Sequence, residues 1–317
     1  MKPVIFGCAG TTLGDEERAF FAEENPFGFI LFQRNCKTPD QVRQLVRDLR
    51  QAVSRADAPV FIDQEGGRVA RLKPPHWPEL PALRQIGEVY EKDSTKGIEA
   101  MTLHAQATAR MLTELGINGN CAPVLDLFIE GASSAIGDRA MSRDPAVVVA
   151  LARVAVKTYL ENGVLPVIKH MPGHGRVKAD PHVALPVVEA SRAELEAEDF
   201  LPFAALKDAP IGMNCHVVFT ALDPDAPVSL SAKVHREIIR GAIGFQGLLF
   251  SDDLAMKALN GPLDEIASKA LAAGADIVLY CPGTLPEMRE ISRVLPEMSA
   301  PALEKWGRAQ GRMKTSS

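Results

Sequence analysis

Short apolar runs alternate with longer segments of helical character along this chain, and this alternation limits the folds open to it. Several runs are apolar almost throughout, as expected for strands that are covered on both faces. Eight such candidate strands with helices between them predict an α/β fold, a (β/α)8 barrel of TIM type. A doubly wound sheet is the alternative, because the number of strands does not show whether a sheet closes. The runs are Pro3–Phe6, Gly28–Phe32, Pro59–Ile62, Asn120–Leu125, Val164–Ile168, Ile211–Cys215, Leu248–Phe250 and Asp276–Tyr280.

Helix start and stop signals lie between these runs. Pro39 follows a threonine, as a proline at the first helical position often does. Ser191 and Glu194 have the spacing of a capping box. Gly116 and Gly163 follow helical segments in the manner of C-terminal caps. The signals therefore predict helices in the intervals between the strands.

The composition is that of an ordinary folded domain. The chain has 317 residues, of which 46% are hydrophobic and 24% charged, enough for a substantial core. Its net charge of −5 offers no basic footprint for a nucleic acid or an anionic membrane. No apolar run approaches the roughly 18 residues of a membrane span. We expect residues 1–317 to form one domain, with a loosely held C-terminal tail after about residue 306.

The N-terminal segment Val4–Gly10 superficially resembles a lipoprotein processing site at Cys8. Only Lys2 supplies charge before it, and the apolar stretch is too short for a signal peptide. We therefore expect a first barrel strand here and a cytosolic protein. The cysteines are odd in number and scattered, without CxxC spacing, so we expect neither a disulfide nor a zinc finger. They are Cys8, Cys36, Cys121, Cys215 and Cys281.

The segment Lys169–His182 reads KHMPGHGRVKADPH and holds three of the seven histidines. Imidazole and carboxylate groups are costly to bury without partners, and proline and glycine disfavour helix and central strand. The segment follows an apolar run, which predicts a loop on a rigid scaffold, where catalytic groups are common. Asp63, His216 and Asp252 also follow predicted strands. The carboxyl ends of parallel strands meet at one mouth of a barrel, so we expect these ionisable groups to converge there.

Five segments of the chain carry a family resemblance. One is KHMPGHG with the DPH that follows it, and together the five extend from about Gly28 to about Met256. In this order they resemble bacterial family 3 glycoside hydrolases, more narrowly the single-domain β-N-acetylglucosaminidases of peptidoglycan recycling. The resemblance implies a (β/α)8 barrel and an exo-acting glycosidase that retains the configuration of the sugar. The other four segments are GFILFQRN (Gly28–Asn35), IDQEGGRVARL (Ile62–Leu72), IGDRAMSRDP (Ile136–Pro145) and FSDDLAM (Phe250–Met256).

The resemblance assigns the nucleophile to Asp252, the aspartate directly after Ser251. A retaining glycosidase needs such a carboxylate to attack the anomeric carbon and form a covalent glycosyl-enzyme. Taken alone, the Ser-Asp-Asp sequence would indicate a helix N-cap. Alternation along a strand turns Asp253 the other way, so we expect it to serve capping or structural hydrogen bonds.

The resemblance assigns the acid/base role to His182, oriented by Asp180. Two positions apart in an extended segment place both side chains on one face, so a carboxylate–imidazole hydrogen bond is feasible. Such a bond favours the protonated ring, which can donate to the departing oxygen. The alternative is a plain surface turn. The family has a small serine between the two, where this chain has Pro181; proline is compatible with the dyad and restricts the loop.

The substrate contacts also follow from the resemblance. Asp63 and Arg71 match groups that bind outer hydroxyls, Lys169 and His170 match groups at the hydroxyl edge of the terminal sugar, and Arg139 matches a group that holds the N-acetylglucosamine unit. Carboxylates accept from hydroxyls, and Arg and Lys donate to oxygens. The alternatives are a tight turn at Asp63 and solvated surface charges for Arg68, Arg71 and Arg139. We expect His174 to structure the loop and His216 to be a core histidine whose hydrogen bonds are satisfied, so neither is predicted to be catalytic. Glu65 is a further carboxylate in the mouth that could be mistaken for a catalytic one.

Three other functions remain open at this point. A zinc-dependent barrel hydrolase could use His170, His174, Asp180 and His182 with Asp252 or Asp253, although their spacing matches no established zinc motif. A sugar-binding protein would need no nucleophile and acid pair. Phosphate could replace water as the acceptor, because a histidine repels an anion less than a glutamate does. The implied substrates are muropeptides with N-acetylglucosamine on 1,6-anhydro-N-acetylmuramic acid, and no cofactor, metal or obligate protein partner is expected.

Overall fold

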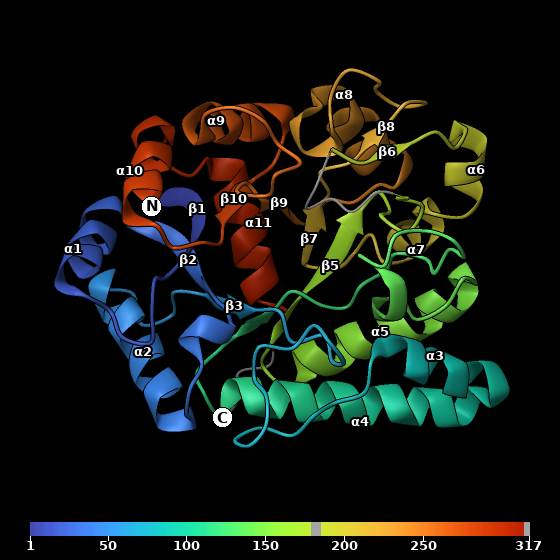
Figure 1. Cartoon of the computed structure of the whole chain (residues 1–317), viewed down its shortest axis with the longest axis horizontal. Helices are drawn as coiled ribbons and strands as arrows, with labels where there is room; N and C mark the ends of the chain where they lie inside the picture. Colours follow the sequence, from blue (N-terminus) through green and yellow to red (C-terminus); the bar gives the residue numbers. More distant parts are fainter. Residues whose placement is uncertain (179–184, 314–317) are drawn as a thin grey trace.

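The computed structural model of the chain describes residues 1–178 and 185–313. Eight parallel strands close into a barrel, because β1 pairs with β2 on one side and with β10 on the other (Figure 1). Each of the eight predicted runs overlaps a strand of this barrel, so the (β/α)8 prediction is confirmed and the open sheet is excluded. The strands are β1 (Lys2–Gly7), β2 (Pro26–Leu31), β3 (Val60–Ile62), β4 (Gly119–Asn120), β5 (Leu165–Met171), β7 (Ile211–Asn214), β9 (Leu248–Asp253) and β10 (Ile277–Tyr280).

Helices surround the barrel, and their ends follow the predicted signals. The hydroxyl of Thr38 accepts from the backbone N–H of Gln41 at the start of α2, and Ser191 and Glu194 form a reciprocal capping box at α6. Among the described residues, no helix is both long and apolar enough to cross a membrane. The helices are α1 (Asp15–Glu24), α2 (Pro39–Ala52), α3 (Leu83–Lys92), α4 (Ser94–Thr113), α5 (Pro145–Glu161), α6 (Arg192–Ala197), α7 (Phe200–Ala205), α8 (Ala232–Val234), which continues as a π-helix (His235–Ala242), α9 (Leu263–Ala273), α10 (Leu285–Val294) and α11 (Ala300–Gln310).

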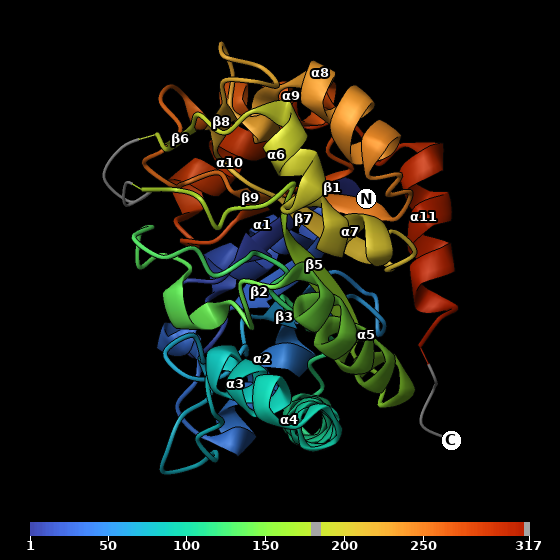
Figure 2. The same ribbon diagram turned by 90° about the vertical axis from the view of Figure 1, so that its right-hand side faces the viewer.

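The amino-terminal end of the barrel is packed with aromatic side chains, and we call this end the floor. Phe250 contacts Phe27 and Phe61 with ring centroids 6.3 and 5.3 Å apart. Trp306 of α11 packs edge-on against Phe27 at 4.8 Å. In Figure 2, α11 lies on the opposite side of the barrel from the small sheet of β6 (Val187–Val188) and β8 (Val218–Phe219).

Helix α11 also revises the expected C-terminal tail. The helix continues past Trp306 to Gln310, and Ala309 is buried. Lys305 of the same helix donates to both carboxylate oxygens of Asp276 at 2.7 and 2.9 Å. The prediction of a loosely held chain after residue 306 was therefore wrong for residues 307–310, because apolar packing and an ion pair hold the helix against the floor.

Candidate active site

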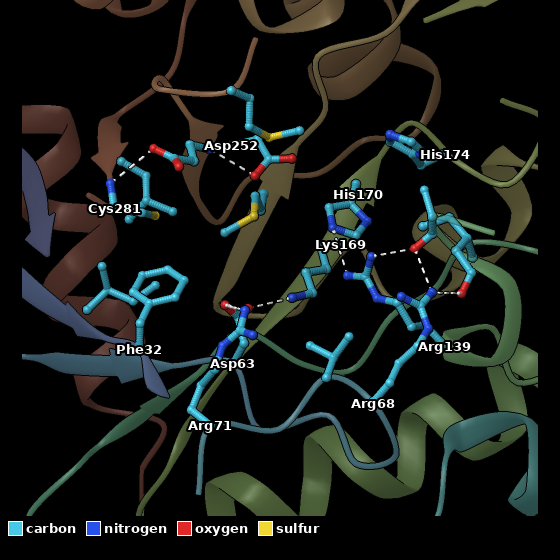
Figure 3. A pocket seen from close by; sticks show the side chains of 18 residues that line it. Phe32, Asp63, Arg68, Arg71, Arg139, Lys169, His170, His174, Asp252 and Cys281 are labelled. Atoms are coloured by element: carbon cyan, nitrogen blue, oxygen red, sulfur yellow. Dashed lines mark hydrogen bonds and ion pairs between the residues drawn. The ribbon is translucent and has the colours of Figure 1, made fainter. Parts of the chain in front are cut away.

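A cavity of about 400 Å³ opens at the carboxyl ends of the barrel strands, within the size range of small-ligand sites (Figure 3). Asp63 directly follows β3, Lys169 and His170 lie at the end of β5, and Asp252 lies at the end of β9. The structure thus brings together the predicted site residues that it describes. Those that line the cavity are Asp63, Arg71, Arg139, Lys169, His170 and Asp252.

Asp63 is held between two cations at one wall of the cavity. Lys169 donates to its Oδ1 at 2.8 Å and Arg71 to its Oδ2 at 3.0 Å. Burial alone would raise the pKa of Asp63, but the charges of Lys169 and Arg71 outweigh it and hold the pKa well below its ordinary value. Asp63 is therefore an ionised acceptor, and the tight-turn interpretation is insufficient for it.

Glu65 and Arg139 form a second, deeper ion pair. Both carboxylate oxygens of Glu65 accept from Arg139 at 2.9 Å, and Lys169 lies 2.7 Å from Oε1. Burial alone would raise the pKa of Glu65, but Arg139 and Lys169 lower it to about 2. Glu65 is not a free carboxylate in the mouth: its partners make it the counter-ion that fixes Arg139. Arg139 is mostly buried, so the alternative of a solvated surface charge does not hold for it.

Arg68 has a different role from Arg139. Its side chain is about half exposed, and it pairs with Asp138 at 2.7 Å. It also donates to the backbone carbonyls of Ser134, Ala135 and Ile136. Arg68 therefore ties the loop after β3 to the loop that carries Arg139.

The two adjacent aspartates of β9 have different partners. Asp253 accepts from the backbone N–H groups of Cys281 at 3.0 Å and Ala255 at 3.1 Å, so it has the structural role expected for it although it also borders the cavity. Among the described residues, the carboxylate of Asp252 accepts only from the N–H of Asp253, at 2.8 Å. Its other oxygen thus has no described donor.

The electrostatics of Asp252 suit a nucleophile. Burial would raise its pKa, but the neighbouring imidazoles of His170 and His216 outweigh burial and hold the pKa below its ordinary value. By contrast, burial raises the pKa of Asp253 to about 6. Asp252 is therefore the more readily ionised of the pair.

Asp126 is a site residue that the sequence analysis did not identify. Its Oδ2 lies 2.6 Å from Nδ1 of His170, and its side chain is fully buried. A usable signal existed, because Asp126 directly follows the predicted run Asn120–Leu125 just as Asp63 follows its own strand.

The remaining two histidines near the mouth differ from each other. Nδ1 of His216 lies 2.7 Å from the Ser229 hydroxyl and its Nε2 lies 3.0 Å from the carbonyl of Asp253, so it is the satisfied core histidine that was expected. His174 lines the cavity, and its buried Nδ1 has no hydrogen-bond partner among the described residues. A Cβ at neighbouring Gly175 would lie 2.2 Å from the carbonyl oxygen of Leu127, so this turn requires glycine.

The predicted dyad lies outside the described residues: Asp180, Pro181 and His182 all fall in 179–184. Within residues 1–178 and 185–313, no group of three or more His, Cys, Asp or Glu side chains has the geometry to hold a metal ion. The five cysteines all lie in those ranges and are free thiols. The described residues therefore supply no set of zinc ligands, and a zinc site would depend on Asp180 and His182, which lie outside them.

Apolar side chains also line the cavity, among them Ile30, Met213, Leu279 and Phe32. Arg71 and Arg34 both pack on the Phe32 ring in a cation–π arrangement, with their guanidinium carbons 5.0 and 5.1 Å from the ring centroid. Polar groups that hydrogen-bond hydroxyls and apolar groups that contact carbon suit the two kinds of surface on a sugar ring.

Known proteins resemble this chain over most of its length. The model of the glycosyl hydrolase family 3 N-terminal domain matches residues 9–304. A β-hexosaminidase of Alkalilimnicola ehrlichii is 39% identical over 285 residues, which cover 89% of this chain and 81% of that protein. Among solved structures, NagZ of Neisseria gonorrhoeae in complex with N-trifluoroacetyl-D-glucosamine has a TM-score of 0.89 at 32% identity, covering 97% of this chain and 89% of its own.

A second solved structure extends the comparison. A family 3 β-N-acetylglucosaminidase from a Paenibacillus species has a TM-score of 0.88 at 29% identity and covers 98% of this chain and 60% of its own. The family match spans most of the chain, and the charged residues that line the cavity and the carboxylate at the end of β9 lie within it. This chain belongs to glycosyl hydrolase family 3 and is a hydrolase of glycosidic bonds.

Proposed function

We propose that this protein is a retaining exo-β-N-acetylglucosaminidase that removes a terminal N-acetylglucosamine through a covalent intermediate on Asp252. One observation carries the proposal: a half-buried, ionised carboxylate, one oxygen of which accepts no hydrogen bond from the described residues, borders a cavity that Asp63 and Lys169 also line. The names of the matched relatives support the sugar. A hydroxyl-binding wall without such a carboxylate would suit a binding protein instead.

The chemistry takes two displacements at the anomeric carbon. In the first, an Asp252 oxygen bonds to C1 while the bond from C1 to the leaving oxygen breaks, and His182 gives that oxygen a proton. In the second, water bonds to C1, its proton passes to His182, and the ester bond to Asp252 breaks. Two inversions return the sugar with its original configuration. Asp180 orients His182 in this proposal.

Recognition of a terminal sugar follows from the charged wall. Asp63 accepts from hydroxyls, while Lys169, Arg71 and Arg139 donate to oxygens. Because these groups are paired with one another before a substrate binds, they are already oriented and little ordering remains on binding. His170 contributes a ring nitrogen at the same wall.

The natural substrates proposed are cytosolic muropeptides that carry N-acetylglucosamine on 1,6-anhydro-N-acetylmuramic acid. This step rests on the similarity to single-domain enzymes of peptidoglycan recycling. The proposal includes no cofactor, metal or obligate protein partner. Phosphate as the acceptor in place of water is the second candidate, because a histidine acid/base repels a phosphate anion less than a carboxylate does.

The test is one assay on two substrates, each under four conditions. Nitrophenyl β-N-acetylglucosaminide and β-glucoside are each incubated with enzyme, with and without phosphate and with and without EDTA. We expect rapid cleavage of the first substrate only, with free sugar as the product and no effect of EDTA. Sugar 1-phosphate as the main product would establish the phosphorylase. Loss of activity on chelation, restored by zinc, would overturn the proposed mechanism.

The acid role of His182 has its own test. His182→Ala should keep the first-step rate on dinitrophenyl glycosides, whose leaving group needs no proton, and lose the natural disaccharide. Equal losses on both substrates would contradict an acid role and indicate positioning instead.

A further inference from the structure

Asp126 and His170 make a buried contact at the end of β5. Asp126 is fully buried, and its two carboxylate oxygens together accept three hydrogen bonds. Oδ1 accepts from the backbone N–H of His170 at 3.2 Å and that of His174 at 2.7 Å. Oδ2 lies 2.6 Å from the ring nitrogen Nδ1 of His170. One oxygen thus holds the turn, and the other holds the ring.

The other ring nitrogen of His170 faces Arg139. Nε2 lies 3.4 Å from Nη2 of Arg139, whose guanidinium is itself fixed by Glu65. A guanidinium only donates hydrogen bonds, so the nitrogen opposite it has to be an acceptor. A carboxylate only accepts, so Nδ1 has to carry the proton. Both neighbours therefore select the same tautomer.

The ring has little freedom to change this arrangement. His170 is buried, and its ring packs edge-on against that of His174, with centroids 5.6 Å apart and planes 61° apart. The contact between Nε2 and Arg139 is long for a hydrogen bond, so the Nε2 lone pair stays available to a ligand in the cavity.

We propose that Asp126 is a positioning residue that holds His170 in the neutral Nδ1–H tautomer, so that Nε2 accepts a hydrogen bond from one hydroxyl of the terminal sugar. The second half of this proposal rests on the proposed function, since it places a sugar in the cavity. The first half concerns the free protein only.

A specificity follows from the polarity of this contact. An accepting Nε2 needs a group that donates, and a hydroxyl does so. Fluorine in its place cannot donate, and it faces a lone pair. One of the 3-, 4- or 6-fluoro analogues of the substrate should therefore lose more than tenfold in kcat/KM relative to its hydroxyl parent, on the order expected for one lost hydrogen bond in a buried site.

Asp126→Asn tests the arrangement with a nearly isosteric change. The asparagine Oδ1 can keep both backbone hydrogen bonds, while Nδ2 replaces the oxygen that faces the ring. An amide NH₂ donates, so Nδ1 would become the acceptor and the proton would move to Nε2. Nε2–H would then point toward the guanidinium and the cavity as a donor.

The first readout is the tautomer itself in ¹⁵N-histidine-labelled protein without substrate. His170 is assigned by the signal that disappears in His170→Gln. We expect the Nδ1–H form in the wild type and the Nε2–H form in Asp126→Asn. An Nε2–H or doubly protonated ring in the wild type would overturn the proposal, and this result does not depend on whether the variant folds.

Asp199→Asn is the matched control. Asp199 is another buried aspartate beside the same turn, near Gly173, but it pairs with Arg176 at 2.7 Å and is not a partner of the His170 ring. Its substitution should leave the tautomer of His170 unchanged. A change in both variants would mean that the signal reports general loosening of the turn, and would contradict a specific role for Asp126.

The second readout is kinetic. In Asp126→Asn we expect KM to rise by about 10- to 100-fold with a smaller fall in kcat, and the preference for hydroxyl over fluorine to shrink, because a donating Nε2 tolerates fluorine. An unchanged preference would overturn the assigned contact. A wild-type enzyme with the Nδ1–H tautomer but no glycosidase activity would instead defeat the proposed function and leave the tautomer assignment in place.

Discussion

The two ends of the barrel differ in the side chains that dominate them, charged at the mouth and aromatic at the floor. At the mouth, Asp63, Glu65 and Lys169 are buried charges that satisfy one another. At the floor, Phe27 and Trp306 pack ring against ring. Burying charge gives little net stability even when the pairing is good, whereas burying aromatic surface gives a great deal.

This difference between the two ends separates the residues that stabilise the fold from those that bind and act on a ligand. A charged cluster at the end of a barrel is a poor means of stabilisation, so its presence beside a cavity favours a binding role. The aromatic contacts of the floor serve stability. Substitutions at the mouth should therefore alter activity more than folding, and substitutions at the floor the reverse.

The largest effect should come from Asp252→Asn at the mouth. Losing the nucleophile should lower kcat by roughly ten-thousand-fold, as for other enzymes that lose a group forming the covalent intermediate. The thermal midpoint should change little. Steady-state kinetics and calorimetry on the same preparation check this. An activity loss below about a hundredfold would contradict a covalent role.

Lys169→Met should combine both kinds of effect. It removes a donor to the sugar and leaves Asp63 and Glu65 with one cation fewer, so we expect kcat/KM to fall about 100- to 1,000-fold and the free energy of unfolding to fall by about 3–5 kcal/mol. Lys305→Met is the matched control, because Lys305 pairs with Asp276 at the floor. Equal losses of activity in the two variants would break the distinction between the ends.

Trp306→Ala should affect only folding. Trp306 is buried against Phe27, and its removal should lower the free energy of unfolding by about 3–5 kcal/mol while kcat/KM of the folded enzyme stays unchanged. Leu303→Ala on the same helix is the control, because that side chain is 45% exposed and should cost less than about 0.5 kcal/mol. Urea unfolding measures both. A change in kcat/KM at 25 °C, well below the transition, would count against the comparison.

Asp253→Asn should produce a small, pH-dependent gain in stability. Burial raises the pKa of Asp253 to about 6, so the folded state favours the protonated form. That stability is complete below the ordinary carboxyl pKa and is lost as pH rises through about 6. Between pH 4 and pH 8 the variant should therefore gain about 1–3 kcal/mol relative to the wild type. A constant difference in melting temperature across this range would refute the raised pKa.

The barrel could be predicted from the sequence because parallel strands covered on both faces are continuous apolar runs. Their exact ends could not. The run Asn120–Leu125 contributes only Asn120 to the strand β4, which begins one residue earlier at Gly119, and one bridge at Val124, because Pro123 has no N–H to donate.

The residue pattern alone predicts site residues only where a strand end carries the signal, as at Asp63 and Asp252, and the family resemblance added Arg71 and Arg139. The pairing of Glu65 with Arg139 could not be predicted, because it joins residues 74 positions apart whose contact exists only once the barrel has closed. Asp126 carries the same strand-end signal, but its contact with His170, 44 positions away, likewise exists only in the folded barrel.

The central claim is that Asp252 forms a covalent bond to the sugar, and trapping that intermediate tests it most directly. In 5-fluoro N-acetylglucosaminyl fluoride, the ring fluorine slows both steps while the fluoride leaving group preserves the first. We predict a stable glycosyl-enzyme whose mass and peptide map place the sugar on Asp252, with Asp253→Asn labelled and Asp252→Asn unlabelled. An unlabelled wild-type enzyme with normal turnover, or a sugar on any other residue, would contradict the account.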